Sequence, residues 1–340
     1  MIQFTDEDEI EAAFQHYRIT GFPYPNLTRH EIIHRFRELQ ATKSKILRAR
    51  RKHLPGMPNW PRVIGRHSRD QILANYFHPH IYASHAQGMR SPLQSYQIDK
   101  SLRKAIQLSL KWFDNADRIA VLRHLQLVNG TQPCSNFRPS AAKAVYDYLG
   151  GNDVLDMSTG YGGRLLGFLA SSCKGAYTGI DPSRLTYEGN KRIAKEFDVE
   201  SRVRLILSPF EDVPMSKLPK VDVAFTSPPY FGKEIYDESD DKEKQSRERY
   251  LTYAEWVKGF LRPMMKKAIA CIRPQGILAI NIADISLKSY RYPLIDKTIQ
   301  IAEAEGFPLA DRLELHFGGF GKGLSKTKHE PVLIFRRRLR

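Results

Sequence analysis

The chain lacks the features of a disulfide-stabilised or membrane-spanning protein. Its 340 residues include three cysteines, Cys134, Cys173 and Cys271, which are odd in number and widely separated. This excludes a disulfide framework and a paired-cysteine metal site, so we expect buried thiols. No run of about eighteen apolar residues occurs, and the N-terminal MIQFTDEDEIEAAF is acidic, which predicts neither a membrane span nor a secretion signal. We therefore expect a cytoplasmic protein with no membrane partner.

Acidic residues are scarce relative to basic ones. The chain has 53 lysines and arginines against 37 aspartates and glutamates, a formal charge of +16. Twelve of the basic residues lie between positions 29 and 69, where Glu31 and Glu38 are the acidic residues. We call positions 29–69 the basic stretch. Such an excess attracts polyanions, so nucleic acid is the expected partner, against the alternative of a merely soluble basic surface.

Two regions follow from the hydrophobic pattern. In the basic stretch, Ile32, Ile33, Phe36, Leu39, Ile46 and Leu47 keep helical spacing and predict one or two amphipathic helices with a cationic face. A second helical pattern covers residues 101–127. After residue 130, short apolar runs alternate with helical segments, which predicts an α/β fold with a doubly wound, mostly parallel sheet. We expect domains at 1–130, basic and mainly helical, and at 131–340.

The predicted strands and helices of the second region alternate along the chain. The strands are 153–156, 176–181, 203–208, 221–226, 276–281 and 331–335, and the helices are 162–170, 184–196, 253–272 and 293–306. Ligands of such sheets bind at the carboxyl ends of the strands. We therefore expect the functional residues at those ends.

The first strand end, VLDMSTGYGGRLLGFL, predicts a nucleotide-like cofactor. The residues expected to bind it are Asp156, Ser158, Thr159, Gly160, Gly162 and Gly163. Glycines let a ligand approach the backbone where a helix begins. The alternative is a dinucleotide site, but its fingerprint requires glycine where Leu165 stands.

The next two strand ends supply further contacts for the same cofactor. Asp181, in YTGIDPS, is expected to accept hydrogen bonds from both hydroxyls of a ribose, although it is also a candidate helix N-cap. In LSPFEDV, Phe210 is expected to cover an adenine ring, with Glu211 or Asp212 accepting from its amino group.

The fourth strand end, VAFTSPPYFG, predicts a site for a planar amine. The expected catalytic residues are Ser227, Pro228, Pro229 and Tyr230. Paired prolines fix the backbone, and hydrogen bonds to Ser227 and the Pro228 carbonyl would favour an exposed nitrogen lone pair. Tyr230 would stack on a base swung out of its helix. The alternative is an ordinary proline turn.

These motifs together resemble the amino-methyltransferase group of class I S-adenosylmethionine-dependent enzymes, which includes DNA methyltransferases of phages and prophages. DMSTGYGG, GIDPS and TSPPYF carry the resemblance, and SPPY is more typical of cytosine-N4 than of adenine-N6 enzymes. The resemblance implies a Rossmann-like fold with an antiparallel last strand at HEPVLIFRR. It also implies that NFRPSAAKAVYDYL covers the methionine end of the cofactor, through Phe137, Arg138 and Pro139.

The resemblance implies methyl transfer from S-adenosylmethionine to an exocyclic amino nitrogen of a base in double-stranded DNA, with cytosine N4 favoured over adenine N6. Three alternatives stay open: a tRNA or rRNA base methyltransferase, a protein-glutamine N-methyltransferase, and an inactive DNA-binding protein. No target-recognition region follows the motifs, so recognition is assigned to residues 1–130. The segment 232–249 mixes both charges and is expected to be a loop that closes over the base or has no role.

A metal is not expected. His78, His80 and His85 lie close together in FHPHIYASH, but without an acidic or cysteine partner they are interpreted as structural histidines. Cys134 is interpreted as dispensable, because methylation of an amine needs no covalent intermediate. The residues expected to bind DNA phosphates are Arg48, Arg50, Arg51, Lys52 and Lys322.

The basic stretch gives a first testable prediction. Changing Arg48, Arg50, Arg51 and Lys52 together to glutamine should flatten the slope of log affinity against log salt by about one unit per lost phosphate contact. The measurement is fluorescence anisotropy with a labelled duplex over a series of salt concentrations. An unchanged slope with an unchanged methylation rate would place the DNA contacts elsewhere, at Lys322, Lys326 and the C-terminal arginines.

Overall fold

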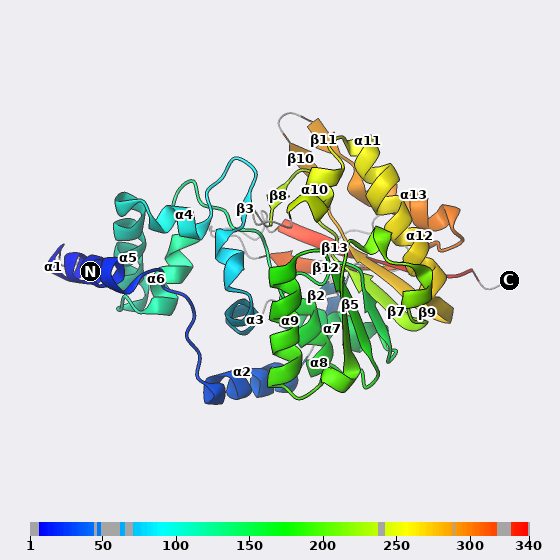
Figure 1. Cartoon of the computed structure of the whole chain (residues 1–340), viewed down its shortest axis with the longest axis horizontal. Helices are drawn as coiled ribbons and strands as arrows, with labels where there is room; N and C mark the ends of the chain where they lie inside the picture. Colours follow the sequence, from blue (N-terminus) through cyan, green and yellow to red (C-terminus); the bar gives the residue numbers. More distant parts are fainter. Residues whose placement is uncertain are drawn as a thin grey trace.

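The computed structural model describes residues 7–43, 46–48, 62–64, 71–236, 242–287, 290–317 and 328–338. The described part of the first 130 residues is mainly helical, as the sequence predicts. Their helices are α1 (Glu7–Thr20), α2 (Arg29–Ala41), α3 (Gln71–Phe77), η1 (Pro79–Ala83), α4 (Pro92–Tyr96), α5 (Asp99–Phe113) and α6 (Arg118–Leu125). α1, α5 and α6 pack around Leu102 and Ile106, and Figure 1 shows them at one end of the molecule, away from the sheet.

Local capping explains where α2 begins. The Thr28 hydroxyl accepts a hydrogen bond from the Glu31 amide, and the Glu31 carboxylate accepts one from the Thr28 amide. This reciprocal arrangement satisfies two amide groups that the first turn of a helix leaves without partners. The helical prediction is confirmed for this first part of the basic stretch.

One sheet runs through the rest of the molecule, in the order β1-β2-β12-β13-β9-β7-β4-β5-β6. Its strands are β1 (Ile46–Arg48), β2 (Arg62–Ile64), β4 (Val154–Asp156), β5 (Tyr177–Asp181), β6 (Val203–Leu207), β7 (Val221–Thr226), β9 (Ile272–Asn281), β12 (Leu309–Phe317) and β13 (Lys328–Arg336). The five neighbouring strands β9, β7, β4, β5 and β6 are parallel. β13 is antiparallel to both of its neighbours, β9 and β12. The predicted doubly wound, Rossmann-like class I methyltransferase fold, with its antiparallel last strand, is confirmed by this topology.

Helices cover both faces of the sheet. One face carries α7 (Pro139–Leu149), α8 (Gly163–Ala170) and α9 (Arg184–Glu196), and the other carries α12 (Arg262–Cys271) and α13 (Leu294–Ala304). Side chains of β13 alternate between the two cores: Val332 and Ile334 belong to the first, Leu333 and Phe335 to the second. A strand buried on both faces has no polar side, which explains the continuous apolar runs in the sequence.

The remaining elements are short, and several lie beside the carboxyl ends of the strands. They are β3 (His85–Ala86), β8 (Glu234–Ile235), β10 (Ile285–Leu287), β11 (Tyr290–Tyr292), α10 (Ser246–Arg249), α11 (Tyr253–Trp256), η2 (Glu200–Arg202), η3 (Phe210–Asp212), η4 (Met215–Lys217), η5 (Lys242–Lys244) and η6 (Val257–Leu261). α11, η6 and α12 follow one another without a break and form the helix predicted for residues 253–272, except that Ile272 already begins β9.

The helical prediction is wrong at Ile46 and Leu47. Both residues lie in β1, which pairs antiparallel with β2, and β2 in turn runs parallel to β12. The spacing of an apolar run this short does not distinguish a helix from a strand. Pairing with β2, which itself pairs with the edge of β12, favours the strand. The basic stretch therefore reaches the edge of the sheet.

The division near residue 130 remains a prediction. α2 contacts α8, α3 contacts α9, and β3 pairs antiparallel with β8, so parts of the first region contact the sheet region directly. Residues before position 130 therefore help to build the surroundings of the strand ends.

Candidate active site

The carboxyl ends of β4, β5 and β7 open into one pocket. The predicted residues that line it are Phe137, Arg138, Ser158, Thr159, Gly160, Asp181, Phe210, Glu211, Ser227, Pro228, Pro229 and Tyr230. These come from five segments that are far apart in the sequence. The structure thus brings the residues predicted for the cofactor and for the target amine to one place, at the edge of the sheet where ligands of this fold class bind.

Four predicted residues lie behind the pocket wall: Pro139, Asp156, Gly162 and Gly163. Pro139 begins α7, where its missing N–H costs nothing. Gly162 has a φ of +73°, and a Cβ there would lie 2.5 Å from Ile193 Cδ1 and 2.7 Å from His78 Cε1. A Cβ on Gly163 would overlap the Phe137 carbonyl. These glycines allow the start of α8 to pack closely against its neighbours.

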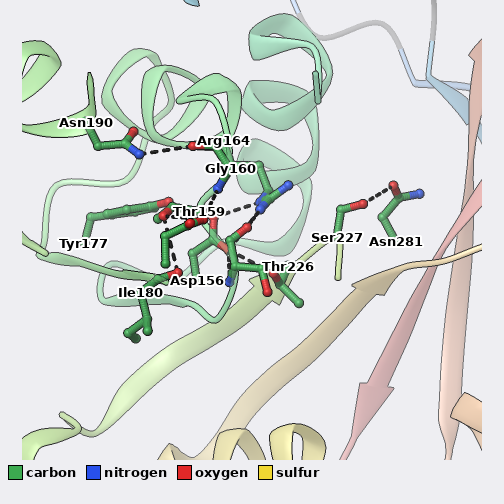
Figure 2. A network of polar contacts seen from close by, with 12 residues as sticks. Asp156, Thr159, Gly160, Arg164, Tyr177, Ile180, Asn190, Thr226, Ser227 and Asn281 are labelled. Carbon is green, nitrogen blue, oxygen red and sulfur yellow. Dashed lines mark hydrogen bonds and ion pairs between the residues drawn. The ribbon is translucent and has the colours of Figure 1, made fainter. Parts of the chain in front are cut away.

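The Asp156 carboxylate is fully buried at the end of β4 and binds side chains from three neighbouring elements (Figure 2). It accepts from Arg164 Nε at 2.8 Å on α8, from the Tyr177 hydroxyl at 2.7 Å on β5, and from the Thr226 hydroxyl at 2.9 Å on β7. The Ser158 amide donates to it at 3.2 Å. These contacts place Asp156 in the frame that shapes the pocket.

Arg164 is the charged partner of Asp156. Its side chain is 4% exposed, and it also donates to the Ser158 carbonyl. Burial by itself would lower the pKa of the guanidinium, but the charge of Asp156 and its hydrogen bonds raise that pKa above its ordinary value. Arg164 therefore stays charged and holds the turn after β4 through both the Asp156 side chain and a carbonyl.

Asp181 borders the pocket at the tip of β5. Its Oδ2 accepts from the Gly160 amide at 2.9 Å, and its Oδ1 accepts from the Ser183 amide at 3.1 Å. Burial raises the pKa of this carboxyl to about 6, against these two hydrogen bonds, which lower it. The alternative role as an N-cap of α9 is wrong, because Ser183 occupies that position and accepts from the Thr186 amide.

The glycine turn and Asp181 are joined directly. Gly160 adopts a φ of +58°, a conformation that favours glycine, and this aims its amide at Asp181. The Asn190 side chain donates to the Gly160 carbonyl at 3.1 Å from the facing helix α9. A carboxylate has about four acceptor sites, and Gly160, Ser183 and the Thr159 hydroxyl at 3.4 Å occupy at most three of them, so Asp181 retains acceptor capacity for a ligand hydroxyl. The residues present therefore fit a ribose-bearing cofactor.

Phe210 and Glu211 line the pocket beyond β6. Phe210 is buried, and Glu211 accepts from Arg249 Nη1 at 2.9 Å and from the Tyr250 hydroxyl at 3.0 Å. Burial raises the pKa of the Glu211 carboxyl. Through Arg249, the end of the segment 232–249 is bonded to Glu211, the residue expected to contact adenine. Residues 244–247 of the same segment line the pocket.

Ser227 and Tyr230 follow β7 and make different contacts. The Ser227 hydroxyl donates to Asn281 Oδ1 at 3.0 Å. The Tyr230 hydroxyl accepts from the Ala283 amide at 3.1 Å and donates to Glu330 at 3.4 Å. Burial raises the pKa of Tyr230 well above its ordinary value, so the phenol stays protonated. Its ring forms part of the wall, with the Lys233 ammonium 5.1 Å from the ring centroid.

Sequence reasoning missed several residues of the pocket. Asn281 and Glu330 line it from β9 and β13, and Glu234 and Tyr236 line it from the segment after Tyr230. Asn281 carried a usable signal, because it ends a predicted strand on the ligand side of the sheet. Glu234 carried none, since its position depends on the pairing of β8 with β3, which lies about 150 residues earlier.

The histidines and cysteines have structural contacts. His78 is buried against the glycine turn, its Nδ1 donates to the Ala74 carbonyl at 3.1 Å, and burial lowers its pKa to about 3. His80 Nε2 lies 3.2 Å from the Thr186 hydroxyl. All three cysteines are buried, as predicted. Burial raises the pKa of the Cys134 thiol, which donates to the His85 and Ile235 carbonyls.

The predicted DNA-binding residues fall largely outside the described ranges. Arg50, Arg51, Lys52 and Lys322 are not described, and for Arg48 the structure describes the β1 backbone alone. Within the described residues, no three histidine, cysteine or acidic side chains are grouped as metal ligands. In the same part of the chain, every helix is too short or too polar to cross a bilayer.

The chain resembles several solved structures. No protein-family model matches the chain, and no curated protein matches it. TrmN from Thermus thermophilus is 17% identical with a TM-score of 0.42, over 59% of this chain and 49% of that chain. A precorrin-6y C5,15-methyltransferase from Geobacter metallireducens is 10% identical with a TM-score of 0.41, over 59% and 87%. The M. jannaschii tRNA m1G37 methyltransferase is 14% identical with a TM-score of 0.36, over 59% and 49%.

These similar structures differ in what their names say they act on, and one fold serves many substrates. The chain also spans about half the length of TrmN. The fold assignment therefore rests on the strand order of the sheet. Any proposal for the substrate rests on the residues of the pocket.

The buried ion pair gives a stability prediction. Arg164→Met should lower the free energy of unfolding by about 3–5 kcal/mol, because it leaves the Asp156 charge buried without its partner. Arg273→Met is the matched control. Arg273 pairs with Asp153 and Asp222 but is 42% exposed, so its loss should cost within about 1 kcal/mol. Urea denaturation measures both, and equal losses would contradict the role given to Asp156.

Proposed function

We propose that this chain transfers a methyl group from S-adenosylmethionine to an exocyclic amino nitrogen of a nucleic-acid base, with cytosine N4 of double-stranded DNA as the favoured target. The observation that carries the proposal is the convergence of two sets of groups in one pocket. The glycine turn and Asp181 suit a ribose-bearing cofactor, and the segment from Ser227 to Tyr230 suits a planar amine.

The residues present divide between these two tasks. Asp181 would accept from the ribose hydroxyls, Phe210 would cover the adenine ring, and Phe137 and Arg138 would lie at the methionine end. For Glu211 to accept from the adenine amino group, it would share its carboxylate with Arg249 and Tyr250. When bound, S-adenosylmethionine supplies an electrophilic methyl group on its sulfonium, so the protein has no leaving group to activate.

The protein's task is to prepare the amine. The lone pair of an exocyclic amino group is delocalised into the base, which makes the nitrogen a poor nucleophile. Hydrogen bonds from its two N–H groups to the Ser227 oxygen and the Pro228 carbonyl favour a tetrahedral nitrogen with its lone pair exposed. The Tyr230 ring holds the plane of the base, because its hydroxyl is anchored to Ala283 and Glu330. Alignment of the two reactants supplies the remaining rate enhancement, and the nitrogen loses one proton to water after its bond to the methyl group has formed.

Charge supports a nucleic-acid substrate over a polypeptide. The net charge of +16 and the basic stretch favour a polyanion. A base inside a duplex must leave its stack before a buried pocket can receive it. DNA is preferred over RNA because of the sequence resemblance, and the nucleoside measurement below separates the two.

The pKa of Asp181 predicts the pH dependence of cofactor binding. The ionised carboxylate accepts both ribose hydroxyls, and it is protonated below a pKa of about 6. Affinity for S-adenosylmethionine should be constant above about pH 7 and fall by roughly tenfold for each pH unit well below 6. Titration calorimetry between pH 5 and 8 measures it. Asp181→Asn should bind weakly with no such dependence, and a pH-independent wild type would remove the ribose assignment.

The reaction product is the direct test of the proposal. Cells that express the chain should contain N4-methylcytosine in their DNA, as measured by mass spectrometry of nucleosides, and Ser227→Ala should lower the signal. If the product were N6-methyladenine, the target base would be adenine, and the proposed amine mechanism would still hold. Methylation confined to RNA would overturn the choice of DNA, and 5-methylcytosine would overturn the amine mechanism.

A further inference from the structure

We propose that Asn281 is a positioning residue that forces the Ser227 hydroxyl to donate to the Asn281 side-chain oxygen, so that the lone pairs of the Ser227 oxygen are presented to the target amine. The identity of that amine rests on the proposed function. The direction of the hydroxyl rests on the contacts of Asn281 alone.

Asn281 is held in one orientation at the end of β9. Its side chain is 2% exposed, and its Nδ2 donates to the Pro331 carbonyl on β13 at 3.0 Å. A carbonyl accepts and never donates, so the amide group that faces Pro331 must be the NH₂. The other amide atom, Oδ1, therefore faces Ser227, at 3.0 Å (Figure 2).

This orientation determines what Ser227 can offer. A hydroxyl carries one proton and two lone pairs, and Asn281 Oδ1 has no proton to give. Ser227 must therefore donate to Asn281, and its lone pairs remain for a group in the pocket that Ser227 lines. A freely rotating hydroxyl would instead donate to the lone pair of the target nitrogen, which is the pair that has to attack the methyl group.

The hydroxyl of Tyr230 differs from that of Ser227 in its contacts. It accepts from the Ala283 amide, two residues after β9, and donates to Glu330 on β13, so its hydrogen-bonding capacity is used. The ring is what Tyr230 contributes to the pocket. The same two strands thus fix both side chains, but they leave acceptor capacity facing the amine at Ser227.

The kinetic test compares two variants of nearly equal size. Asn281→Leu removes the acceptor of Ser227, and Asn281→Asp keeps an acceptor oxygen there. The measurement is the single-turnover rate of transfer from methyl-tritiated S-adenosylmethionine to genomic DNA of cells that lack the protein. Asn281→Leu should be about tenfold slower than wild type, the value of one ordinary hydrogen bond, and Asn281→Asp should be faster than Asn281→Leu. Cofactor affinity should stay within about twofold in both.

A merely structural role predicts the opposite order. Asp at this position introduces a buried charge, so Asn281→Asp should be the less stable variant, and a rate governed by stability would make it the slower one. That order would overturn the proposal. The double variant Ser227→Ala/Asn281→Leu should be as slow as Ser227→Ala alone, and multiplying effects would also overturn it. Thr298→Val, which removes a fully buried hydroxyl bonded within α13, should leave the rate unchanged.

A second measurement does not depend on activity. Neutron diffraction from deuterated crystals of the full chain should place the Ser227 deuterium between its oxygen and Asn281 Oδ1. A deuterium directed into the pocket would overturn the inference. If the deuterium points at Asn281 and no nucleic acid is methylated, the proposed function fails while the direction of the hydroxyl stands.

Discussion

The buried carboxylate of Asp156 is the constraint on which the site depends. A charge at that depth is stable when it is paired and fully hydrogen-bonded, and its partners come from α8, β5 and β7. Arg164 then holds the turn that contains Ser158, and Thr226 stands immediately before Ser227. A single buried acid therefore fixes the glycine turn after β4 and the start of the segment from Ser227 to Tyr230 relative to each other.

A second frame supports the same segment from the opposite side. Asn281 and Ala283 at the end of β9, together with Pro331 and Glu330 at the start of β13, hold the hydroxyls of Ser227 and Tyr230. The antiparallel β13 is what makes this possible, because its reversed direction brings its first residues beside the last residues of β9. The orientation of the target groups thus follows from the strand order of the fold.

The sequence predicted those parts of the site whose signal is local. Apolar runs that end in Asp156 or Asp181, the glycine turn, and the paired prolines each identify a strand end without knowledge of the fold. It could not predict contacts that depend on distant pairing, such as Ser227 with Asn281 across 54 positions. It failed at Ile46, because pairing at the edge of the sheet overrode the local spacing. The assignment of Asp156 to the cofactor stays a prediction, and its hydrogen bonds to Arg164, Tyr177 and Thr226 were not visible in the sequence, because they depend on distant pairing.

The pairing of β3 with β8 extends this reasoning to the first region of the chain. Ala86 is paired with Glu234, Gln87 donates its amide to the Lys233 carbonyl, and the Cys134 thiol donates to both strands. A thiol whose pKa burial has raised is a hydrogen-bond donor and a poor nucleophile, so Cys134 serves this junction. The segment that carries Tyr230 is consequently bonded to β9 and β13 on one side and to residues before position 130 on the other. Within the described residues, a displacement of β3 would therefore reach the segment that carries Tyr230 through main-chain hydrogen bonds.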